Sequence, residues 1–469
     1  MAGELNKYNH TTKILNNISP SFCLAKWLQV TLHLQNGRNH SCHHPSTHSI
    51  PIEELENDPS ALHNTAYKKT LRKQMLEGVR PKECQYCWNV EDLPGEHISD
   101  RTIKSSDPWA APHLQRIANG DSKTNINPTY VEVSFSNVCN FKCSYCSPVH
   151  SSQWVHEVEK HGPYELTGRQ HNNLDWYKQN KEMPIHHNDY NPYVEAFWKW
   201  WPDLVKGLKV FRITGGEPLL DKNTFKVLDF LYDNPQPQLE LYINTNACVP
   251  DDLVDKYIEK QKALINENKI KKVKLYTSVD GHGKQAEYGR HGLNYNKWYA
   301  NIDKIMTEIP RLEVTIMCTT NILSITSFDK LLQDILTLKL KHKIFNVRNT
   351  PLVLDMSILN WPGHQCASIL PEGYSDLLLS SLKYMQDNLF NTIPNHPWNG
   401  FYDFEIAKME RFIEFIKQKN ESYTPTMLRD FYLFVNEHDK RRDTNFLETF
   451  PELESFYRIC EQENNNRII

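Results

Sequence analysis

Between residues 130 and 353 the sequence alternates short strand-like runs with helical patterns, and this alternation restricts the fold more than any other feature. Six runs are rich in the β-branched and aromatic residues of half-buried strands, and they span residues 130–136, 209–215, 239–245, 272–279, 312–319 and 344–350. Amphipathic helical patterns lie between them, for example over 251–265 and 296–309. Strand–helix units in succession predict a parallel sheet with helices outside. Six units are fewer than the eight of a closed barrel, so we expect an α/β fold with a partial (β/α)6 barrel that binds ligands at the carboxyl ends of its strands.

Outside this alternation the chain divides into two further regions. Residues 1–128 form an N-terminal segment with four cysteines, residues 129–360 carry the predicted barrel, and residues 361–469 show helical apolar spacing without recognisable chemistry. The alternation itself is interrupted at 149–205, which is too long for one crossover helix. The end of this insertion, VEAFWKWW, predicts the first outer helix. We expect the earlier polar and aromatic part to lie over the strand ends as a lid or substrate-binding element.

Composition excludes several classes of protein. Of the 469 residues, 39% are hydrophobic and 23% are charged, which is ordinary for a globular protein. The formal charge of −4 gives no general basic field for nucleic acid. The sequence has no apolar stretch of about 18 residues, and its polar N-terminus lacks an apolar signal core, so we expect a cytoplasmic protein with no membrane partner. Eleven cysteines without a secretory signal favour metal or redox chemistry over disulfides.

Three of those cysteines stand close together directly after the first predicted strand. Cys139, Cys143 and Cys146 have the spacing C-x3-C-x2-C, with no fourth cysteine nearby. A structural zinc ion takes four protein ligands, and an iron–sulfur cube normally takes four thiolates. A [4Fe–4S] cube held by three thiolates leaves one iron open for a small-molecule ligand. The alternatives are a structural zinc site with a distant fourth ligand, or cysteines that only fill the core.

The cysteine spacing, with the aromatic Tyr145 before the last cysteine, resembles the signature of the radical S-adenosylmethionine enzymes. The resemblance covers roughly residues 129–353, and the motif TGGEP, which alone would be only a strand-to-helix turn, follows about 70 residues after the triad. It implies a [4Fe–4S] cluster and S-adenosylmethionine as cofactors, with Tyr145 beside them and Gly215, Gly216 and Glu217 binding the methionyl amino group. In this family the reduced cluster cleaves S-adenosylmethionine into methionine and a 5′-deoxyadenosyl radical, which abstracts hydrogen from the substrate.

Further residues at the strand ends match the family less specifically. Asn246 lies in NTNA after the third predicted strand, Ser278 and Asp280 lie in SVDG after the fourth, and Arg290 lies in YGRHG. The resemblance implies that Asn246 contacts the cofactor, that Ser278 and Asp280 contact ribose or carboxylate oxygens, and that Arg290 binds a carboxylate of S-adenosylmethionine or of the substrate. It places Asn321 near the adenosine, although the usual glycine-rich form is absent there. Asn246, Ser278 and Asp280 could instead cap strand-to-loop turns.

The N-terminal segment carries a second set of cysteines. Cys23 and Cys42 enclose a glycine in the pattern C-x13-G-x4-C, and Cys84 and Cys87 form C-x2-C. This spacing resembles the twitch domain, a shortened SPASM domain that holds an auxiliary [4Fe–4S] cluster, although in the family that domain usually follows the barrel. The alternative is a structural zinc site of four cysteines. Neighbouring histidines could then supply nitrogen ligands, namely His40, His43, His44 and His48.

These features predict a radical S-adenosylmethionine enzyme of the twitch type. We expect a two-electron oxidation, or a bond formation of equal redox level, on a peptide or small polar metabolite, with electrons from a reducing partner such as flavodoxin or ferredoxin. The auxiliary cluster would accept the electron that the substrate radical loses, and Asp280 or Asp355 would take the proton. The insertion would shape the pocket through four aromatic residues, Trp154, Tyr164, Trp176 and Tyr177.

Two other classes of function remain open. A non-catalytic iron–sulfur sensor could retain the barrel, but the triad and TGGEP are both intact, which argues against decay. A zinc-stabilised nucleic-acid-binding protein is suggested by C-x2-C together with the basic run KKTLRK at 68–73, which we interpret as one solvated helix face. The net charge gives this second class no further support.

Anaerobic reconstitution should load about eight irons per chain, because the group of three cysteines and the group of four can each hold a four-iron cube. Iron and acid-labile sulfide are measured after desalting, together with zinc by elemental analysis. Saturation at about four irons with one zinc retained would contradict the auxiliary cluster.

Overall fold

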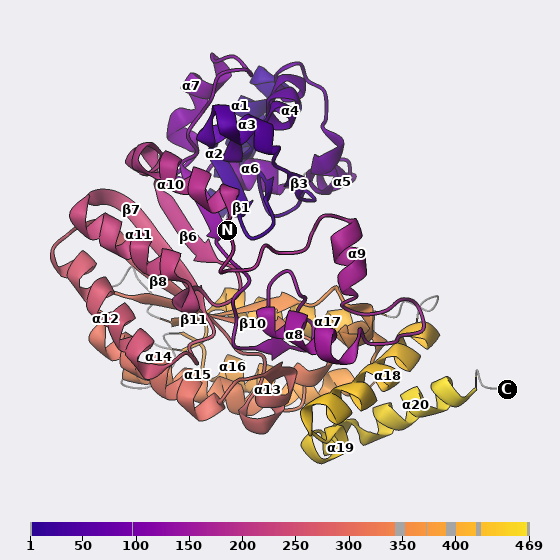
Figure 1. Ribbon diagram of the computed structural model, residues 1–469. Coiled ribbons are helices and arrows are strands. Elements are labelled where there is room, and N and C mark those ends of the chain that lie inside the picture. Colours follow the sequence, from indigo (N-terminus) through magenta and orange to yellow (C-terminus); the bar gives the residue numbers. More distant parts are fainter. Residues whose placement is uncertain are drawn as a thin grey trace.

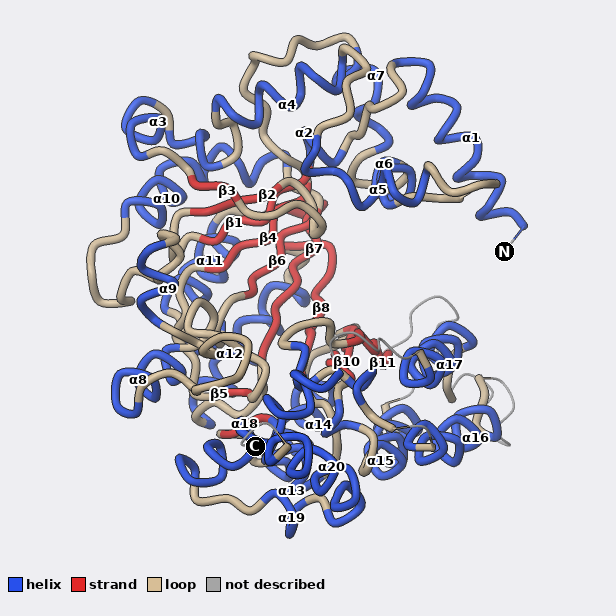
Figure 2. The backbone as a smooth tube through the Cα atoms, turned by 90° about the vertical axis from the view of Figure 1, so that its right-hand side faces the viewer, coloured by secondary structure: helices blue, strands red, loops and turns tan. Residues whose placement is uncertain are grey.

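The structure, a computed structural model, describes residues 2–95, 97–342, 352–371, 373–390, 400–418 and 424–466. Within these residues the centre is a nine-stranded sheet in the order β11–β10–β8–β7–β6–β4–β1–β2–β3, which curves from one edge to the other (Figure 1, Figure 2). Its strands are β1 (Gln29–His33), β2 (Arg38–His40), β3 (His48–Ser49), β4 (Tyr130–Ser134), β6 (Val210–Thr214), β7 (Gln236–Thr245), β8 (Ile270–Ser278), β10 (Glu313–Thr320) and β11 (Leu352–Ile358). The pairings from β1 to β11 are all parallel, whereas β2 and β3 are antiparallel additions beside β1.

Five of the six predicted strands are present close to their predicted positions, as β4, β6, β7, β8 and β10. The sixth predicted run, 344–350, lies outside the described residues, and the strand that pairs with β10 on its other side is β11. The sheet also extends beyond the predicted units, because β1 of the N-terminal segment pairs with β4 from Gln29 to His33. The predicted α/β class with a large parallel sheet is therefore confirmed. The partial (β/α)6 barrel and the domain boundary at residue 128 stay predictions.

Helices cover the outer face of the parallel strands (Figure 1). They are α10 (Pro192–Leu204), α11 (Lys222–Asp233), α12 (Asp251–Asn266), α14 (Tyr295–Glu308) and α15 (Phe328–Lys341). Val131 and Val133 of β4 are buried in the core that these helices share, whereas Glu132 between them lies on the opposite face. Trp201 of α10 packs on Phe211 of β6 with ring centroids 4.7 Å apart. Burial of such a side chain contributes roughly 1.5–3 kcal/mol to folding.

The inner face of the sheet is polar. Arg212 of β6 lies 3.6 Å from Glu132, donates to Asn244 Oδ1 at 3.0 Å, and stacks 4.1 Å from the ring centre of Tyr276. Parallel sheets usually bury apolar side chains on both faces. The partly buried charges on this face therefore distinguish it from the apolar face that packs against the helices.

Helices also form much of the N-terminal segment, and several of them contribute to a second hydrophobic cluster that includes Cys87. They are α1 (Ala2–Ile18), α2 (Ala25–Leu28), α3 (Ile52–Asn57), α4 (Ala66–Leu76), α5 (Gln85–Glu91), α6 (Asp100–Ser105) and α7 (Leu114–Ala118). On α4, Lys68 Nζ lies 2.9 Å from His63 Nδ1, and Arg72 donates to Asn64 Oδ1 at 2.9 Å. Both basic side chains are buried. The interpretation of the basic run as one solvated helix face is therefore wrong for these two residues.

The insertion at 149–205 folds into α8 (Ser152–His161), α9 (Leu174–Gln179) and α10, which takes the place of the predicted first outer helix. The C-terminal region forms α16 (Leu379–Asp387), α17 (Asp403–Lys417), α18 (Thr424–Arg442), α19 (Phe446–Thr449) and α20 (Glu454–Asn465). Helix α18 packs along α20 and reaches α8 through its last residue, Arg442. Two segments far apart in the sequence therefore meet next to the sheet.

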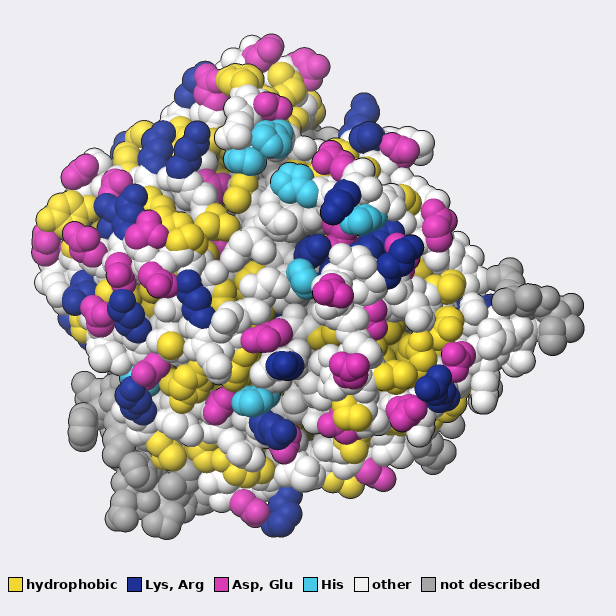
Figure 3. Space-filling view, turned by 60° about the horizontal axis from the view of Figure 1, so that its bottom comes forward, with side chains coloured by type: hydrophobic (Ala, Val, Ile, Leu, Met, Phe, Trp, Pro, Cys, Tyr) yellow, Lys and Arg dark blue, Asp and Glu magenta, His cyan; other side chains and the backbone are white. Residues whose placement is uncertain are grey.

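Charged side chains of both signs are intermingled on the face that Figure 3 shows. That face presents no continuous basic patch of the kind that nucleic acid requires. Among the helices of the described ranges, none combines the length and apolar character needed to cross a bilayer.

Candidate functional site

The cysteine triad lies in the loop that follows β4, at the carboxyl edge of the parallel sheet. Cys143 is buried in the short strand β5 (Lys142–Cys143), which pairs with β9 (Arg290–His291), whereas Cys139 and Cys146 are partly exposed. Trp154 of α8 donates from Nε1 to the Cys143 carbonyl oxygen at 2.9 Å. The turn that carries the three thiols is therefore held by backbone and side-chain hydrogen bonds from two other parts of the chain.

Gly215 and Gly216 let the turn after β6 pass directly against this loop. A Cβ on Gly215 would lie 2.5 Å from Ser134 Oγ, and a Cβ on Gly216 would lie 2.3 Å from the Val138 carbonyl oxygen. Gly215 also has a φ of +120°, which favours glycine. The amide of Glu217 then donates to the Val138 carbonyl oxygen at 2.6 Å. Close backbone packing against the cysteine loop thus requires both glycines, whatever cofactor contacts they make.

The Glu217 carboxylate turns back into the protein. It is 1% exposed and accepts hydrogen bonds from Thr245 Oγ1 at 2.7 Å, Asn246 N at 2.6 Å and Leu219 N at 3.0 Å. Burial raises the pKa of Glu217 to about 7. Asn246 in turn donates from Nδ2 to Asn140 Oδ1 at 2.7 Å, inside the cysteine loop. These contacts join the ends of β6 and β7 to the triad, and cofactor contacts of Glu217 and Asn246 stay predictions.

A buried ion pair stands beside Cys143. Arg290 donates from Nε to Asp280 Oδ2 at 2.8 Å and from Nη2 to Oδ1 at 2.9 Å, and each residue is 7% exposed. The Nη1 atom of Arg290 lies 3.7 Å from Cys143 Sγ. Two further donors reach the Asp280 carboxylate, Tyr145 Oη at 2.7 Å and Thr319 N at 2.8 Å. Burial opposes the charged guanidinium, but Asp280 raises the pKa of Arg290 above its usual range, so a fixed cation stands next to the thiol.

These contacts bear on two predicted roles. Four hydrogen-bond donors reach the Asp280 carboxylate, which is about as many as its two oxygens can accept. Arg290, for its part, already binds a carboxylate of the protein itself, that of Asp280. Asp280 is therefore a positioning residue for Arg290 and Tyr145 in this structure. Its action as a proton acceptor, and the binding of a ligand carboxylate by Arg290, stay predictions.

The remaining predicted residues lie on neighbouring strands. Ser278 ends β8 opposite Met317 of β10. Asn321 follows β10 and caps the next turn, where its Oδ1 accepts from Leu323 N at 2.8 Å. Asp355 lies in the middle of β11 and forms an ion pair with Lys408 of α17. Asn321 therefore caps a turn in this structure. The ligand contacts of Ser278 and Asn321 and the transfer of a proton to Asp355 stay predictions.

The donor chemistry of the triad fits an iron–sulfur cluster. Burial raises the pKa of all three thiols, that of Cys146 to about 12, so a bound metal must displace their protons. The cation of Arg290 beside Cys143 favours the thiolate form that a metal needs. Across the described ranges, no three His, Cys, Asp or Glu side chains are arranged to hold a single metal ion. Cluster binding by the triad therefore stays a prediction.

A pocket of about 520 Å³ opens beside Cys146. The insertion contributes much of its wall, including Arg169, Trp176 and Tyr177, and Trp361 after β11 closes another side. Two of the four aromatic residues predicted to shape the pocket do not line it. Trp154 and Tyr164 are instead completely buried in the core behind the cysteine loop.

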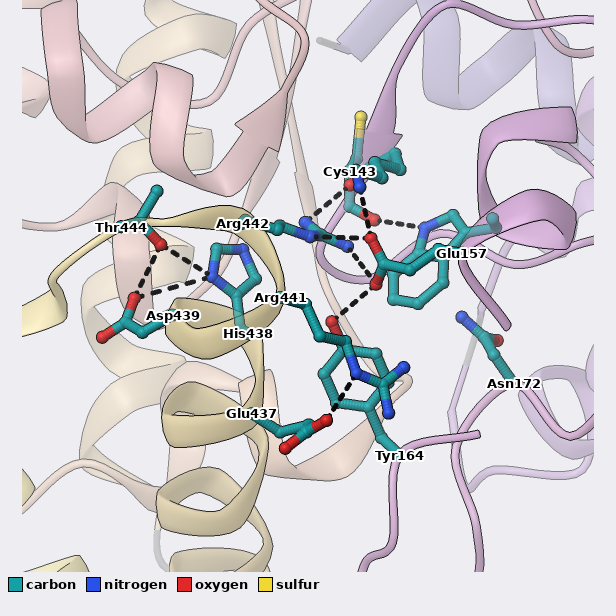
Figure 4. Close-up of polar contacts among 12 residues, drawn as sticks. Cys143, Glu157, Tyr164, Asn172, Glu437, His438, Asp439, Arg441, Arg442 and Thr444 are labelled. Atoms are coloured by element: carbon teal, nitrogen blue, oxygen red, sulfur yellow. Dashed lines mark hydrogen bonds and ion pairs between the residues drawn. The ribbon is translucent and has the colours of Figure 1, made fainter. Parts of the chain in front are cut away.

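Arg442 at the end of α18 supports the cysteine loop (Figure 4). Its Nη1 donates to the Lys142 carbonyl oxygen at 2.9 Å, and its Nε and Nη2 each donate to a Glu157 oxygen at 3.2 Å. Glu157 also accepts from Tyr164 Oη at 2.7 Å. The Arg442 and Glu157 side chains are 0% and 2% exposed. The sequence could not single out Arg442, because a basic residue in the last turn of a helix is ordinarily explained by the helix dipole.

The four N-terminal cysteines line one small cavity of about 20 Å³. Cys23 precedes α2, Cys42 follows β2, and Cys84 and Cys87 stand at the start of α5. Burial raises the pKa of Cys84 and of Cys87 to about 12, and the buried cation Lys26, which lines the same cavity, favours the thiolate of Cys84. The structure therefore brings four thiols to one place. Whether they hold a [4Fe–4S] cluster or zinc stays a prediction.

Histidines connect this cavity with the pocket beside the triad. Of the four that could ligate zinc, His44 lines the cavity, where its Nε2 lies 2.7 Å from Asp100 Oδ2. His40 instead places its Nε2 3.1 Å from His33 Nε2, and the His33 ring lies 6.2 Å from that of His150, which lines the pocket. Burial lowers the pKa of His33 to about 3, so this ring is neutral.

Comparison with known proteins gives limited matches. No family model matches the chain. Two proteins named GTP 3′,8-cyclase are similar over 118 residues, those of Nautilia profundicola at 29% identity and Sulfurimonas denitrificans at 26%. The match covers 25% of this chain, and the chain spans only 27% of the length of each relative.

Among solved structures, the crystal structure of Streptococcus suis SuiB bound to precursor peptide SuiA matches 63% of this chain and 56% of that chain. The sequence identity is 13% and the TM-score is 0.28, at which the likeness supports no conclusion. The two cyclases support the resemblance to the radical S-adenosylmethionine superfamily. The twitch subtype stays a prediction.

Arg442→Ala should lower the free energy of unfolding by about 3 kcal/mol, because it leaves the Glu157 carboxylate buried without its main partner. Urea unfolding of the full-length chain at neutral pH measures the change. Arg458→Ala is the matched control, since that arginine of α20 is 48% exposed and pairs with Glu454, and we expect a change below about 1 kcal/mol. Equal effects of the two substitutions would contradict the role of Arg442.

The ion pair between Arg442 and Glu157 also determines how the stability of the folded protein changes with pH. Burial alone would raise the pKa of Glu157, but Arg442 and Lys142 lower it from 4.5 to about 2. An acid whose pKa falls on folding stabilises the folded state above its unfolded pKa, and this contribution is lost as the pH falls through the folded pKa. The wild type should therefore lose more stability than Arg442→Ala when the pH falls from about 5 toward 2.

Proposed function

We propose that this protein is a radical S-adenosylmethionine enzyme that holds a [4Fe–4S] cluster on Cys139, Cys143 and Cys146. The observation that carries the proposal is a turn with three thiols at the carboxyl edge of a parallel sheet, beside an open pocket. Three protein ligands leave one iron for S-adenosylmethionine. The similarity to two GTP 3′,8-cyclases supports the same class.

Three features of the chain support the proposed chemistry at this site: Arg290, Asp280 and the aromatic residues of the pocket. When bound, the cluster and S-adenosylmethionine supply one-electron chemistry and a carbon radical that abstracts hydrogen. Arg290 offsets the negative charge of the Cys143 thiolate, and Asp280 fixes the guanidinium in place so that little reorganisation is needed. Trp176 and Tyr177 offer aromatic walls against which a substrate could be held near the cysteine loop.

The finer proposal is a two-electron oxidation, or a bond formation of equal redox level, on a peptide or small polar metabolite. Abstraction of one hydrogen leaves a substrate radical that must lose an electron, and a closed cluster on the four N-terminal cysteines is the acceptor that we propose. The row of His40, His33 and His150 supports this, because His40 contacts the Cys42 carbonyl oxygen at one end and His150 lines the pocket beside Cys146 at the other. A flavodoxin or ferredoxin supplies the first electron.

The two alternative functions, a nucleic-acid-binding protein and an iron–sulfur sensor, require different properties of the protein. Lys68 and Arg72 are buried, which removes two basic groups from the surface that a zinc-stabilised nucleic-acid-binding protein would use. A non-catalytic iron–sulfur sensor would hold the triad cluster without turning over S-adenosylmethionine. Formation of 5′-deoxyadenosine separates the sensor from the enzyme.

Cys143→Ala should abolish formation of 5′-deoxyadenosine under dithionite, because it removes one of three anchors of the proposed cluster. Cys84→Ala should retain some uncoupled cleavage while substrate turnover stops. Cys460→Ala is the control, since this buried cysteine lies on α20. Chromatography of the anaerobic reaction measures the product, and circular dichroism checks folding. If Cys143→Ala still forms 5′-deoxyadenosine, the assignment of the triad is wrong.

With a candidate peptide or metabolite supplied, the product should be lighter by two hydrogens, with one 5′-deoxyadenosine formed per product. Loss of one hydrogen atom and then of an electron and a proton requires this mass and stoichiometry. Mass spectrometry and chromatography measure the two quantities. Regeneration of S-adenosylmethionine with a product of unchanged mass would show that no net electron leaves, and would refute the oxidation.

A further inference from the structure

The pocket beside Cys146 contains a guanidinium that stacks on two exposed indoles. Arg169 lies in the loop between α8 and α9, and its guanidinium carbon is 4.4 Å from the ring centre of Trp361 and 5.8 Å from that of Trp176. The two tryptophans are 56% and 43% exposed, although large apolar side chains are normally covered. All three residues line the pocket. Exposed aromatic rings around a cation in a concave site are typical of a binding surface.

Arg169 has no acidic partner in the described parts of the chain. The ion pairs of those parts engage the other arginines of the site, Arg290 with Asp280 and Arg442 with Glu157. The pocket wall contains no Asp or Glu among the described residues. Its histidines are neutral, because burial lowers the pKa of His150 and lowers that of His171 to about 3. Among the described residues that line the pocket, Arg169 is therefore a cation without a carboxylate beside it.

The loop that carries Arg169 is anchored from the C-terminal region. Thr167 N donates to Asp430 Oδ1 of α18 at 2.5 Å, and Arg441 Nη1 donates to the Gly162 carbonyl oxygen at 2.8 Å. At its other end His171 pairs with Tyr164 through two backbone hydrogen bonds. A binding group on a loop fixed at both ends loses less conformational freedom when a ligand arrives.

We propose that Arg169 determines substrate specificity by binding an oxyanion of the substrate, a carboxylate or a phosphate, while Trp176 and Trp361 contact an adjacent planar or apolar group. A guanidinium presents parallel N–H donors that match these oxyanions, and here it must displace no carboxylate of the protein, unlike Arg290. The inference rests on the proposed function, because it takes the pocket beside Cys146 as the place of the substrate. It narrows the substrate class to anionic molecules.

The test is calorimetric titration of the full-length, anaerobically reconstituted protein with three probes, benzoate, phenyl phosphate and benzamide. At least one of the two anions should bind about tenfold or more tightly than neutral benzamide, and the tighter anion identifies a carboxylate or a phosphate as the natural group. Arg169→Gln should remove this preference. Trp361→Ala should weaken the anions and benzamide alike, because it removes the shared aromatic contact.

Arg116→Gln is the matched control, since Arg116 is an exposed arginine on α7 outside this pocket. The inference is overturned if benzamide binds as tightly as both anions, or if Arg116→Gln removes the preference as Arg169→Gln does. It is also overturned if Arg169→Gln weakens binding of S-adenosylmethionine by the same factor, because the anion would then belong to the cofactor. Absence of 5′-deoxyadenosine from the wild type would instead refute the proposed function, and the probe titration would still report on the pocket.

Discussion

The buried pair of Arg290 and Asp280 fixes the elements on which the candidate site depends. Asp280 follows β8, Arg290 begins β9, and the same carboxylate accepts from Thr319 of β10 and from Tyr145 of the cysteine loop. Buried charges are costly unless they are paired and fully hydrogen-bonded, and loss of one partner typically costs about 3–5 kcal/mol. The pairing therefore allows one arrangement of the cysteine loop against the sheet and penalises others.

Three regions that are far apart in the sequence meet at that loop. The turn with Gly215 and Gly216 packs against its backbone, the insertion contributes Trp154, and the last turn of α18 contributes Arg442. The C-terminal helices show no chemistry in their sequence, yet they hold both the loop of the triad and the loop of Arg169. Packing of these surrounding elements therefore fixes the positions of both loops.

Features of the fold that depend on residues close together in the sequence could be predicted. The alternating runs predicted β4, β6, β7, β8 and β10, and the apolar spacing over 251–265 and 296–309 predicted α12 and α14 to within about a residue. Cysteine spacing led to the triad and to the four thiols that share a cavity.

Contacts across long sequence separations could not be predicted. Strand β1 pairs with a strand about 100 residues later, and the run QVTLH alone does not distinguish a strand of this sheet from any short apolar segment. The sequence motif around Asp280 indicates a ligand contact, but only the fold shows that Arg290, Tyr145 and Thr319 already occupy its oxygens. The same holds for Arg442, whose partner Glu157 lies 285 residues away.

The pairing of β1 with β4 also bears on whether the protein aggregates in solution. It covers the side of β4 that faces away from β6, so a fragment that began near residue 129 would leave the N–H and C=O groups of β4 without partners on that side. Exposed strands of this kind pair readily with other chains and lead to aggregation. The N-terminal segment therefore covers this edge of β4, a task separate from any metal that its cysteines hold. A shortened form of the protein would need a substitute strand there to stay dispersed.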